Sequence, residues 1–303
     1  MTQAGVDVAV VVVTYNSSDV LPGLVETLPV GLDGVTWQLV VVDNASSDDS
    51  PGLAARLAPD CTVVETGRNA GYAAGLNAGV LAAPPHRAVL VLNPDVRLEQ
   101  GCVATLLAAL DRPGVGIAVP RLGDGDGALH LSLRREPTVL RAWGDALLGA
   151  RRAGRWSALG ELVTDPAAYA DGRTVDWGEG STQLVSAACW QACGPWDESF
   201  FLYSEETEFG LRARDRGFAT WFEPTARATH LQGESMTSPR LWALLATNRV
   251  RLHWRRHGPF AGLAFWAGVT LREASRAALG KATSRAALSA LLSPRQWRTR
   301  PAP

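Results

Sequence analysis

This chain of 303 residues has little lysine, few cysteines and almost no net charge. Lys281 is the only lysine, and we attribute this bias to genome composition rather than to function. A formal net charge of -1 argues against binding of nucleic acid over the whole surface, because chains that do so are usually basic. Hydrophobic residues at 47% and charged residues at 19% are typical of a globular protein with one large domain or two smaller ones.

The four cysteines are too few and too scattered for a disulfide framework. Cys189 and Cys193 lie four residues apart, but no histidine or second cysteine pair follows closely enough to complete a zinc site. We therefore interpret all four as buried thiols.

Long apolar runs are also missing. No run reaches the roughly 18 residues of a membrane span, and the segment 260–271 is too short. The N-terminus has no basic segment, and residues 8–13 lead into polar residues without a cleavage signal. We therefore expect a cytoplasmic protein without a signal peptide.

Apolar runs alternate with helical patterns through the first hundred residues. Runs at 8–13, 39–42, 61–65 and 88–92 predict strands, and the patterns at 20–28, 52–57 and 71–81 predict helices. This alternation indicates the α/β class, with a parallel sheet and right-handed crossovers. After Pro120 the pattern loosens, and the later expectations are helices at 140–150 and 186–193, a helix ending at Arg216, strands at 182–185 and 217–223, a mobile loop at 151–173 and helices from Pro239 onward.

Polar residues follow each of the first four strands, where ligands of such sheets bind. They are Thr14, Tyr15 and Asn16, then Asp43 and Asn44, then Asn69 with Gly71, and finally Asn93 with Asp95. Pro94 cannot continue a hydrogen-bond ladder, so the carboxylate of Asp95 is presented just beyond a core strand. A dinucleotide-binding oxidoreductase would need Gly-x-Gly-x-x-Gly after a strand, and the first strand is followed by no glycine.

Six segments occur in an order that resembles a known family. They are VVVVTYNSSDVLPGLVETL, LVVVDNASSDDS, GRNAGYAAGLNAG, LVLNPDV, WDESFFLYSEETEFGLRAR and ATHLQGES. Over residues 8–257 the chain resembles inverting family 2 glycosyltransferases, and most closely their rhamnosyltransferase-like branch. The resemblance implies a single GT-A domain with a nucleotide-sugar-binding half at 1–120 and an acceptor-binding, catalytic half at 121–235, followed by a helical extension at 236–303.

The resemblance also implies the reaction. A sugar, with L-rhamnose from dTDP-rhamnose as the leading guess, would pass from a pyrimidine-diphosphate donor to a hydroxyl of a glycan, lipid-linked or small-molecule acceptor, in polysaccharide or cell wall biosynthesis. A divalent metal, Mg²⁺ or Mn²⁺, would neutralise charge on the departing diphosphate. Asp95 matches the metal-binding acid, although Asn93 replaces the first acid of the usual Asp-x-Asp. His230 would bind metal or phosphate, and a turn role for Asp95 or a structural role for His230 stays open.

Donor contacts are implied for the other strand-end residues. Asp43 would accept from the pyrimidine N–H, and Thr14, Tyr15 and Asn16 would pack around base and ribose. The donor would also be bordered by Asn69, Gly71 and Asn77. Capping of a local turn by Asp43 and Asn44 is the alternative.

The general base of the family is the second acid of a Glu-Asp pair, which matches Glu206. The chain departs from the pattern, with Glu for Asp here and Glu208 for another Asp, so Glu205 remains a second candidate. Two alternatives are a solvated acidic helix face and a catalytically inactive nucleotide-sugar-binding module. A nucleotidyltransferase would need a basic glycine-rich loop near the N-terminus, which the sequence lacks.

Acceptor contacts are expected from Trp177, Trp196 and Asp197, since tryptophan faces stack on sugars, although Trp196 is equally compatible with a core position. The basic run 249–256 beside the apolar segment 260–271 suits either peripheral contact with the inner face of an anionic membrane or packing on the domain. Homodimerisation stays open, and no nucleic acid partner is expected.

Overall fold

The computed structural model describes residues 5–231 and 238–293. The first half contains β1 (Val6–Thr14), α1 (Leu21–Gly31), β2 (Trp37–Asp43), α2 (Ser50–Leu57), β3 (Thr62–Glu65), α3 (Tyr72–Ala82), β4 (His86–Leu92), β5 (Val96–Leu98), α4 (Cys102–Leu110) and β6 (Val115–Gly123). The second half contains β7 (Leu133–Arg134), α5 (Val139–Leu148), α6 (Ala150–Ala153), η1 (Pro166–Tyr169), β8 (Arg173–Val175), β9 (Trp177–Gly178), β10 (Thr182–Ser186), α7 (Ala187–Cys193), η2 (Glu198–Phe200), α8 (Glu205–Asp215), β11 (Ala219–His230), α9 (Pro239–Ala278) and α10 (Ala282–Leu292).

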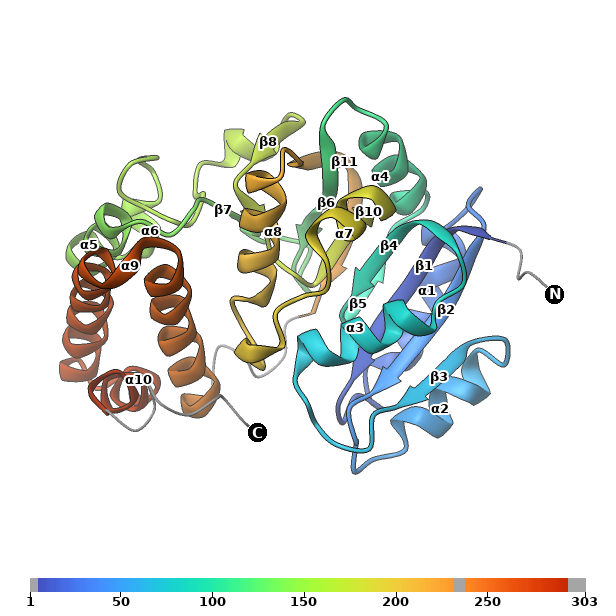
Figure 1. The fold of residues 1–303 in the computed structure, drawn as a ribbon, viewed down its shortest axis with the longest axis horizontal. Coiled ribbons are helices and arrows are strands. Elements are labelled where there is room, and N and C mark those ends of the chain that lie inside the picture. The colour runs from blue at the N-terminus through green and yellow to red at the C-terminus, as the bar shows by residue number, and fades with distance from the viewer. Residues whose placement is uncertain (1–4, 232–237, 294–303) are drawn as a thin grey trace.

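A mixed, mostly parallel sheet forms the centre of the molecule, with the order β3-β2-β1-β4-β10-β6-β11-β5 and β8 paired to β11 (Figure 1). The first four predicted strands are β1 to β4, and they pair in parallel as expected. Strand β10 enters antiparallel between β4 and β6, so its first residue lies beside the last residue of β4. This placement brings residues from both halves of the chain to one edge of the sheet.

Both faces of the sheet are covered by helices, because its strands are apolar on both sides. Helices α1, α2 and α4 pack on one face, where alternate residues of β1, β2 and β4 point. On the other face, which is toward the viewer in Figure 1, lie α3, α7 and α8. Cys189 and Cys193 belong to this second core as free thiols, as predicted.

A separate core joins α5, α9 and α10 at the far side of the molecule (Figure 1). Helix α9 bends at Gly258, which has a φ of 79° and is followed by Pro259. The parts of α9 before and after the bend pack against α10. Within residues 5–231 and 238–293, no helix is long and apolar enough to span a membrane.

The segment 151–173, predicted to be a mobile loop, is built into the fold. It contains α6 and η1, and Tyr169 is fully buried. The Tyr169 hydroxyl donates to the Val163 carbonyl and accepts from the Leu133 amide, both at 3.1 Å. Arg135 adds bonds from its side chain to the carbonyls of Gly154 and Gly160, so the segment is anchored by contacts that its glycine-rich and arginine-rich composition does not reveal.

Candidate functional site

The strand-end residues of β1 and β2 lie side by side and share a hydrogen-bond network. Thr14 Oγ1 donates to Asp43 Oδ1 at 3.1 Å, and Asp43 also accepts from the amide and hydroxyl of Ser46. Asn16 Oδ1 accepts from the Ser47 amide at 2.7 Å. The Asp43 carboxylate is buried and holds the turn after β2, which is the capping arrangement recognised as an alternative in the sequence.

The residues after β3 connect this turn to α3. Asn44 Nδ2 donates to the Gly71 carbonyl at 2.9 Å, and the Gly71 amide donates to Asn69 Oδ1 at 3.1 Å. Tyr15, which is 51% exposed, lines a cavity of about 120 Å³ whose wall is made by Val13, Tyr15, Asn44, Asn69, Gly71, Tyr72, Phe201 and Leu202. The strand-end residues Tyr15, Asn44, Asn69 and Gly71 are therefore brought together as the sequence predicts.

Three residues expected to bind donor or acceptor, Asn77, Trp177 and Trp196, make contacts within the protein instead. Asn77, expected at the donor, donates to the Trp196 carbonyl at 2.9 Å and accepts from the Trp196 amide at 2.9 Å, so its amide holds α3 to the following chain. Trp196 is only 1% exposed and stacks on Phe209 with ring centroids 5.4 Å apart. Trp177 is also buried, with its indole N–H bonded to the Arg135 carbonyl. Trp196 thus takes the core position that the sequence left open, and the acceptor contacts of the two tryptophans stay a prediction.

Asp197 caps the short helix η2 rather than standing free. Its Oδ1 accepts from the Ser199 amide at 2.9 Å, and its Oδ2 lies 3.2 Å from Arg255 Nη1 of α9. A partly exposed carboxylate remains at the surface, but its bonds serve the local turn and the contact with α9.

Asp95 and His230 meet at the carboxyl edge of the sheet. Asp95 follows β4, and His230 is the last residue of β11, which extends beyond the predicted 217–223 because its end pairs with β5. The atoms Asp95 Oδ2 and His230 Nε2 lie 3.3 Å apart. Burial opposes a charged His230, but the hydrogen bond and charge of Asp95, with the charge of Glu179, raise its pKa. The following stretch 232–235 lies outside the described residues.

Glu179 and His130, which the sequence did not single out, stand on the other edge of the His230 ring. Glu179 Oε1 is 4.0 Å from His230 Nδ1, and Glu179 Oε2 is hydrogen-bonded to His130 Nε2. Burial would raise the pKa of Glu179, but the His130 hydrogen bond and the charge of Arg134 outweigh it and lower the pKa to about 2. His130, Glu179 and His230 thus form a group able to hold a metal ion.

Glu205 and Glu206 begin α8, beside this cluster. Burial, and then repulsion from Glu206, raises the pKa of Glu205 well above its usual range. Burial also raises the pKa of Glu206 to about 7, and the charge of Glu179 acts in the same direction. The Tyr72 hydroxyl is buried nearby, and burial with the charges of both glutamates raises its pKa, so it stays a neutral donor.

A strained loop, residues 201–204, positions these two glutamates. Phe201, Tyr203 and Ser204 have φ values of 66°, 67° and 77°, a region that residues other than glycine rarely occupy. Asn248 of α9, fully buried, holds the loop with its side-chain amide, which donates to the carbonyls of Phe200 at 2.8 Å, Leu202 at 2.9 Å and Tyr203 at 3.2 Å.

The strained loop also leans on α3. The Tyr72 amide donates to the Phe201 carbonyl at 2.7 Å, and a Cβ added at Gly71 would lie 2.3 Å from that carbonyl oxygen. Gly71, with φ of 95°, is thus required by its approach to the strained loop rather than by contact with the sheet.

Residues 9–156 match a family described as glycosyl transferase family 2. The chain carries a glycosyltransferase family 2 domain. Among its relatives is the N-acetylglucosaminyl-diphospho-decaprenol L-rhamnosyltransferase of Mycobacterium tuberculosis, 29% identical over 75% of this chain and 76% of the relative. This glycosyltransferase is thus similar to a rhamnosyltransferase in sequence.

Solved structures support the GT-A fold of the glycosyltransferase. A mannosyltransferase from Pyrobaculum calidifontis, in complex with GDP-Man and Mn²⁺, is 17% identical with a TM-score of 0.59, over 97% of this chain and 84% of its own. GalNAc-T7 with UDP, GalNAc and Mn²⁺ is 16% identical with a TM-score of 0.56, over 82% of this chain, which spans about half, 48%, of that protein.

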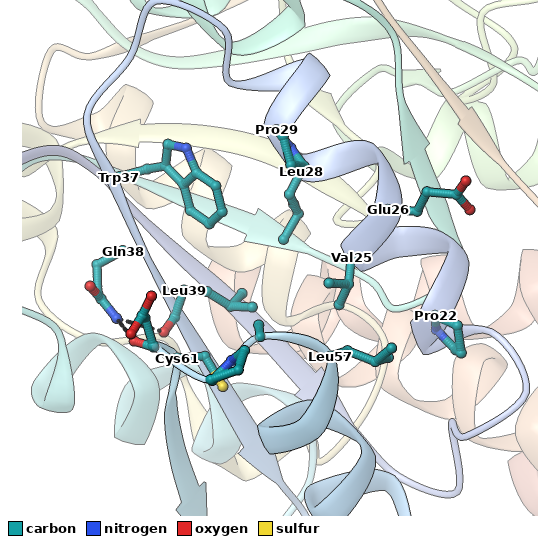
Figure 2. A pocket seen from close by; sticks show the side chains of 13 residues that line it. Pro22, Val25, Glu26, Leu28, Pro29, Trp37, Gln38, Leu39, Leu57 and Cys61 are labelled. Atoms are coloured by element: carbon teal, nitrogen blue, oxygen red, sulfur yellow. Dashed lines mark hydrogen bonds between the residues drawn. The ribbon is translucent and has the colours of Figure 1, made fainter.

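A larger cavity of about 690 Å³ lies away from the site (Figure 2). It opens between α1 and the connection from α2 to β3, beside the first residues of β2, and Trp37, Leu57 and Cys61 line it. The carboxyl edge of the sheet is at the other end of these strands, so this cavity does not belong to the glycosyltransferase site.

Sequence reasoning missed Tyr72, His130, Glu179 and Asn248. His130 and Glu179 are separated by 49 residues and meet only through the tertiary fold. Asn248 carried one signal, since a polar residue of low helix propensity interrupts an otherwise apolar and basic helical pattern.

Proposed function

We propose that this glycosyltransferase moves L-rhamnose from dTDP-rhamnose to a hydroxyl of a lipid-linked acceptor, with inversion at the anomeric carbon. The observation that carries the proposal is the convergence of Asp95, His230 and Glu206 at the carboxyl edge of a family 2 sheet. The choice of sugar and acceptor is supported by the similarity to the L-rhamnosyltransferase of Mycobacterium tuberculosis, whose name includes a diphospho-decaprenol acceptor.

The donor base and ribose are assigned to the β1 and β2 ends. Tyr15 is exposed enough to pack on a pyrimidine, and Thr14 with Asn16 fixes the turn beneath it. Asp43 holds the turn after β2, and it is also the proposed acceptor of the hydrogen bond from the pyrimidine N–H. Asn44, Asn69 and Gly71 form the wall toward the diphosphate.

Asp95 and His230 are the proposed ligands of a divalent metal, Mg²⁺ or Mn²⁺, with Asn93 beside them. The 3.3 Å between their facing atoms is close to the separation of two ligands on one ion, about 3 Å for bonds of 2.0–2.2 Å. When bound, the metal supplies positive charge that stabilises the leaving diphosphate. A carboxylate and an imidazole are both suitable ligands for Mn²⁺.

Glu206 is the proposed general base, and it takes the proton of the acceptor hydroxyl. A pKa of about 7 suits this role, because a base near the operating pH is both deprotonated and able to hold the proton. Glu205 is more deeply buried, and burial followed by repulsion from Glu206 raises its pKa well above the usual range. We assign Glu205 to a supporting role beside Tyr72.

Peripheral membrane contact is proposed for the bend of α9, since a lipid-linked acceptor resides at a membrane. Phe260 is 90% exposed and Leu263 is 54% exposed just after Gly258, and Arg255 precedes them. An exposed aromatic beside basic residues suits an anionic lipid surface.

Two measurements test the function. In a thermal-shift panel of nucleotide sugars with Mn²⁺, dTDP-rhamnose should raise the melting temperature most, because a ligand that binds only the folded form stabilises it. Glu206→Gln should abolish transfer and keep the donor-induced shift, whereas Glu205→Gln should retain most activity. Equal turnover by Glu206→Gln and the wild type would refute the assignment, and a shift by purine donors alone would refute the donor.

A further inference from the structure

His230 lies between two carboxylates and offers one ring nitrogen to each. Its Nε2 faces Asp95 at 3.3 Å, and its Nδ1 faces Glu179 at 4.0 Å. The two nitrogens sit on different edges of the imidazole ring, and their lone pairs diverge. One ion therefore cannot bind Asp95 through the Nε2 edge and Glu179 through the Nδ1 edge at once.

The Nδ1 atom of His230 is buried and lacks a hydrogen bond to the described residues. His230 is 7% exposed, and its Nδ1 has no hydrogen-bond partner among residues 5–231 and 238–293. Buried polar atoms without partners are rare in folded proteins and call for a ligand or another cause. Glu179 faces this nitrogen, and one ligand atom from each of His130, Glu179 and His230 lies within 4.8 Å of the other two.

We propose that His130, Glu179 and His230 form a second cation site, distinct from the one at Asp95. Two imidazoles and one carboxylate favour a first-row transition ion such as Zn²⁺ or Co²⁺ over Mg²⁺, which prefers oxygen ligands. Ligands at about 2.1 Å from a tetrahedral ion are roughly 3.4 Å apart, so the widest of the three separations shortens by about an ångström on binding. The His130 and His230 rings already meet edge to face, with centroids 5.9 Å apart.

Occupancy of this site regulates the proposed donor site, and this consequence rests on the proposed function. A neutral imidazole has one lone pair, so a His230 that binds through Nδ1 carries its proton on Nε2 and donates it to Asp95. His230 then no longer serves the ion at Asp95. Zn²⁺ or Co²⁺ bound at this site therefore competes with Mn²⁺-dependent donor binding, because both ions need the side chain of His230.

Titration of the metal-free full-length chain with Co²⁺ tests the site without using activity. The wild type should take up one tightly bound equivalent and show the visible absorption of low-coordinate Co²⁺ with nitrogen ligands. His130→Gln should weaken this binding at least tenfold, and Glu179→Gln should do the same as an independent variant. Asp95→Asn should keep the absorption, because Asp95 is not a ligand of this site. His86→Gln is the matched control, since His86 lies at the opposite end of β4.

The outcomes separate the two proposals. Loss of the Co²⁺ absorption in Asp95→Asn together with its survival in His130→Gln would overturn the second site and leave the donor site standing. Retention of wild-type Co²⁺ affinity by both His130→Gln and Glu179→Gln would also overturn it. In the competition arm, Zn²⁺ should weaken Mn²⁺-dependent dTDP binding at least tenfold in the wild type and much less in His130→Gln. Equal weakening in both proteins would refute the competition, whereas absence of any dTDP binding would refute the proposed function instead.

Discussion

Replacement of Asn248 by leucine should slow transfer far more than it weakens donor binding. Leucine has the same branching and the same number of side-chain heavy atoms but no donor group, so the change removes the bonds to the carbonyls of Phe200, Leu202 and Tyr203 without adding charge. The amide has two hydrogens, and each buried acceptor left without a partner costs about 1–3 kcal/mol, so the lost restraint is on the order of 2–6 kcal/mol.

The strained loop stores a similar energy. Each of its three left-handed residues costs on the order of 1 kcal/mol, or about 3 kcal/mol in total. Relaxation of the three strained residues releases this energy. Without the bonds from the Asn248 amide to oppose the relaxation, alternative backbone conformations of the strained loop become populated. Glu206 is the second residue of the helix that follows the strained loop, and a shift of its carboxylate by about 1 Å costs roughly a hundredfold in rate.

Steady-state kinetics and donor titration measure this effect. We expect kcat of Asn248→Leu to fall about a hundredfold while the Kd for dTDP with Mn²⁺ changes less than threefold. Trp242→Phe is the matched control, because it also removes a buried hydrogen bond of α9, from Trp242 Nε1 to Glu273 Oε2 at 2.9 Å, without contact to the strained loop. Equal kcat in the two variants at equal melting temperature would refute the argument.

Three further predictions follow from single contacts. Gly71→Ala should lower both the melting temperature and kcat more than Gly67→Ala, because both glycines have positive φ but only a Cβ at Gly71 meets the strained loop, and equal effects on both would contradict this. The rate should rise as pH increases through about 7, where Glu206 loses its proton. Because the pKa of Glu206 is higher in the folded than in the unfolded chain, ionisation of this group lowers stability as pH rises from about 4.5 to 7. Glu206→Gln should therefore melt at a higher temperature than the wild type at pH 8 and not at pH 4. Phe260→Asp should reduce cosedimentation with anionic vesicles at least several-fold, while Leu81→Asp, which changes an equally exposed residue on α3, should not.

The sheet and its edge were predictable from the sequence because they depend on local patterns. An apolar run of four or more residues specifies a buried strand, and the polar residue after it is then placed at the edge by the parallel topology. Asp43 and Asp95 were located in this way, and the helix that carries Glu206 ends at Asp215, one residue before the predicted Arg216. Such inferences succeed because each needs only neighbours along the chain.

The positions that the sequence did not resolve belong to residues whose role depends on what packs against them. Trp196 was open between an acceptor platform and the core, and only its stacking on Phe209 decides for the core. Asn77 lies on a helix beside the crevice, but its amide faces a backbone segment 119 residues later. His130 and Glu179 escaped notice for the same reason, since neither lies in a motif that gives it chemistry of its own.

The contacts of α9 bear on the division of the chain at 235/236. The third core, of α5, α9 and α10, gives the C-terminal helices the features of a separate extension. Asn248 nevertheless lies in α9 and restrains the loop that precedes the proposed base, and Arg249 in the same helix contacts Glu161 at 2.6 Å. A chain ended at residue 235 would keep the sheet, the strand-end residues and Asp95, but would lose every bond from Asn248. We therefore expect such a truncated chain, if it folds, to bind dTDP with Mn²⁺ and to transfer no sugar, because the helical extension is a working part of the catalytic half.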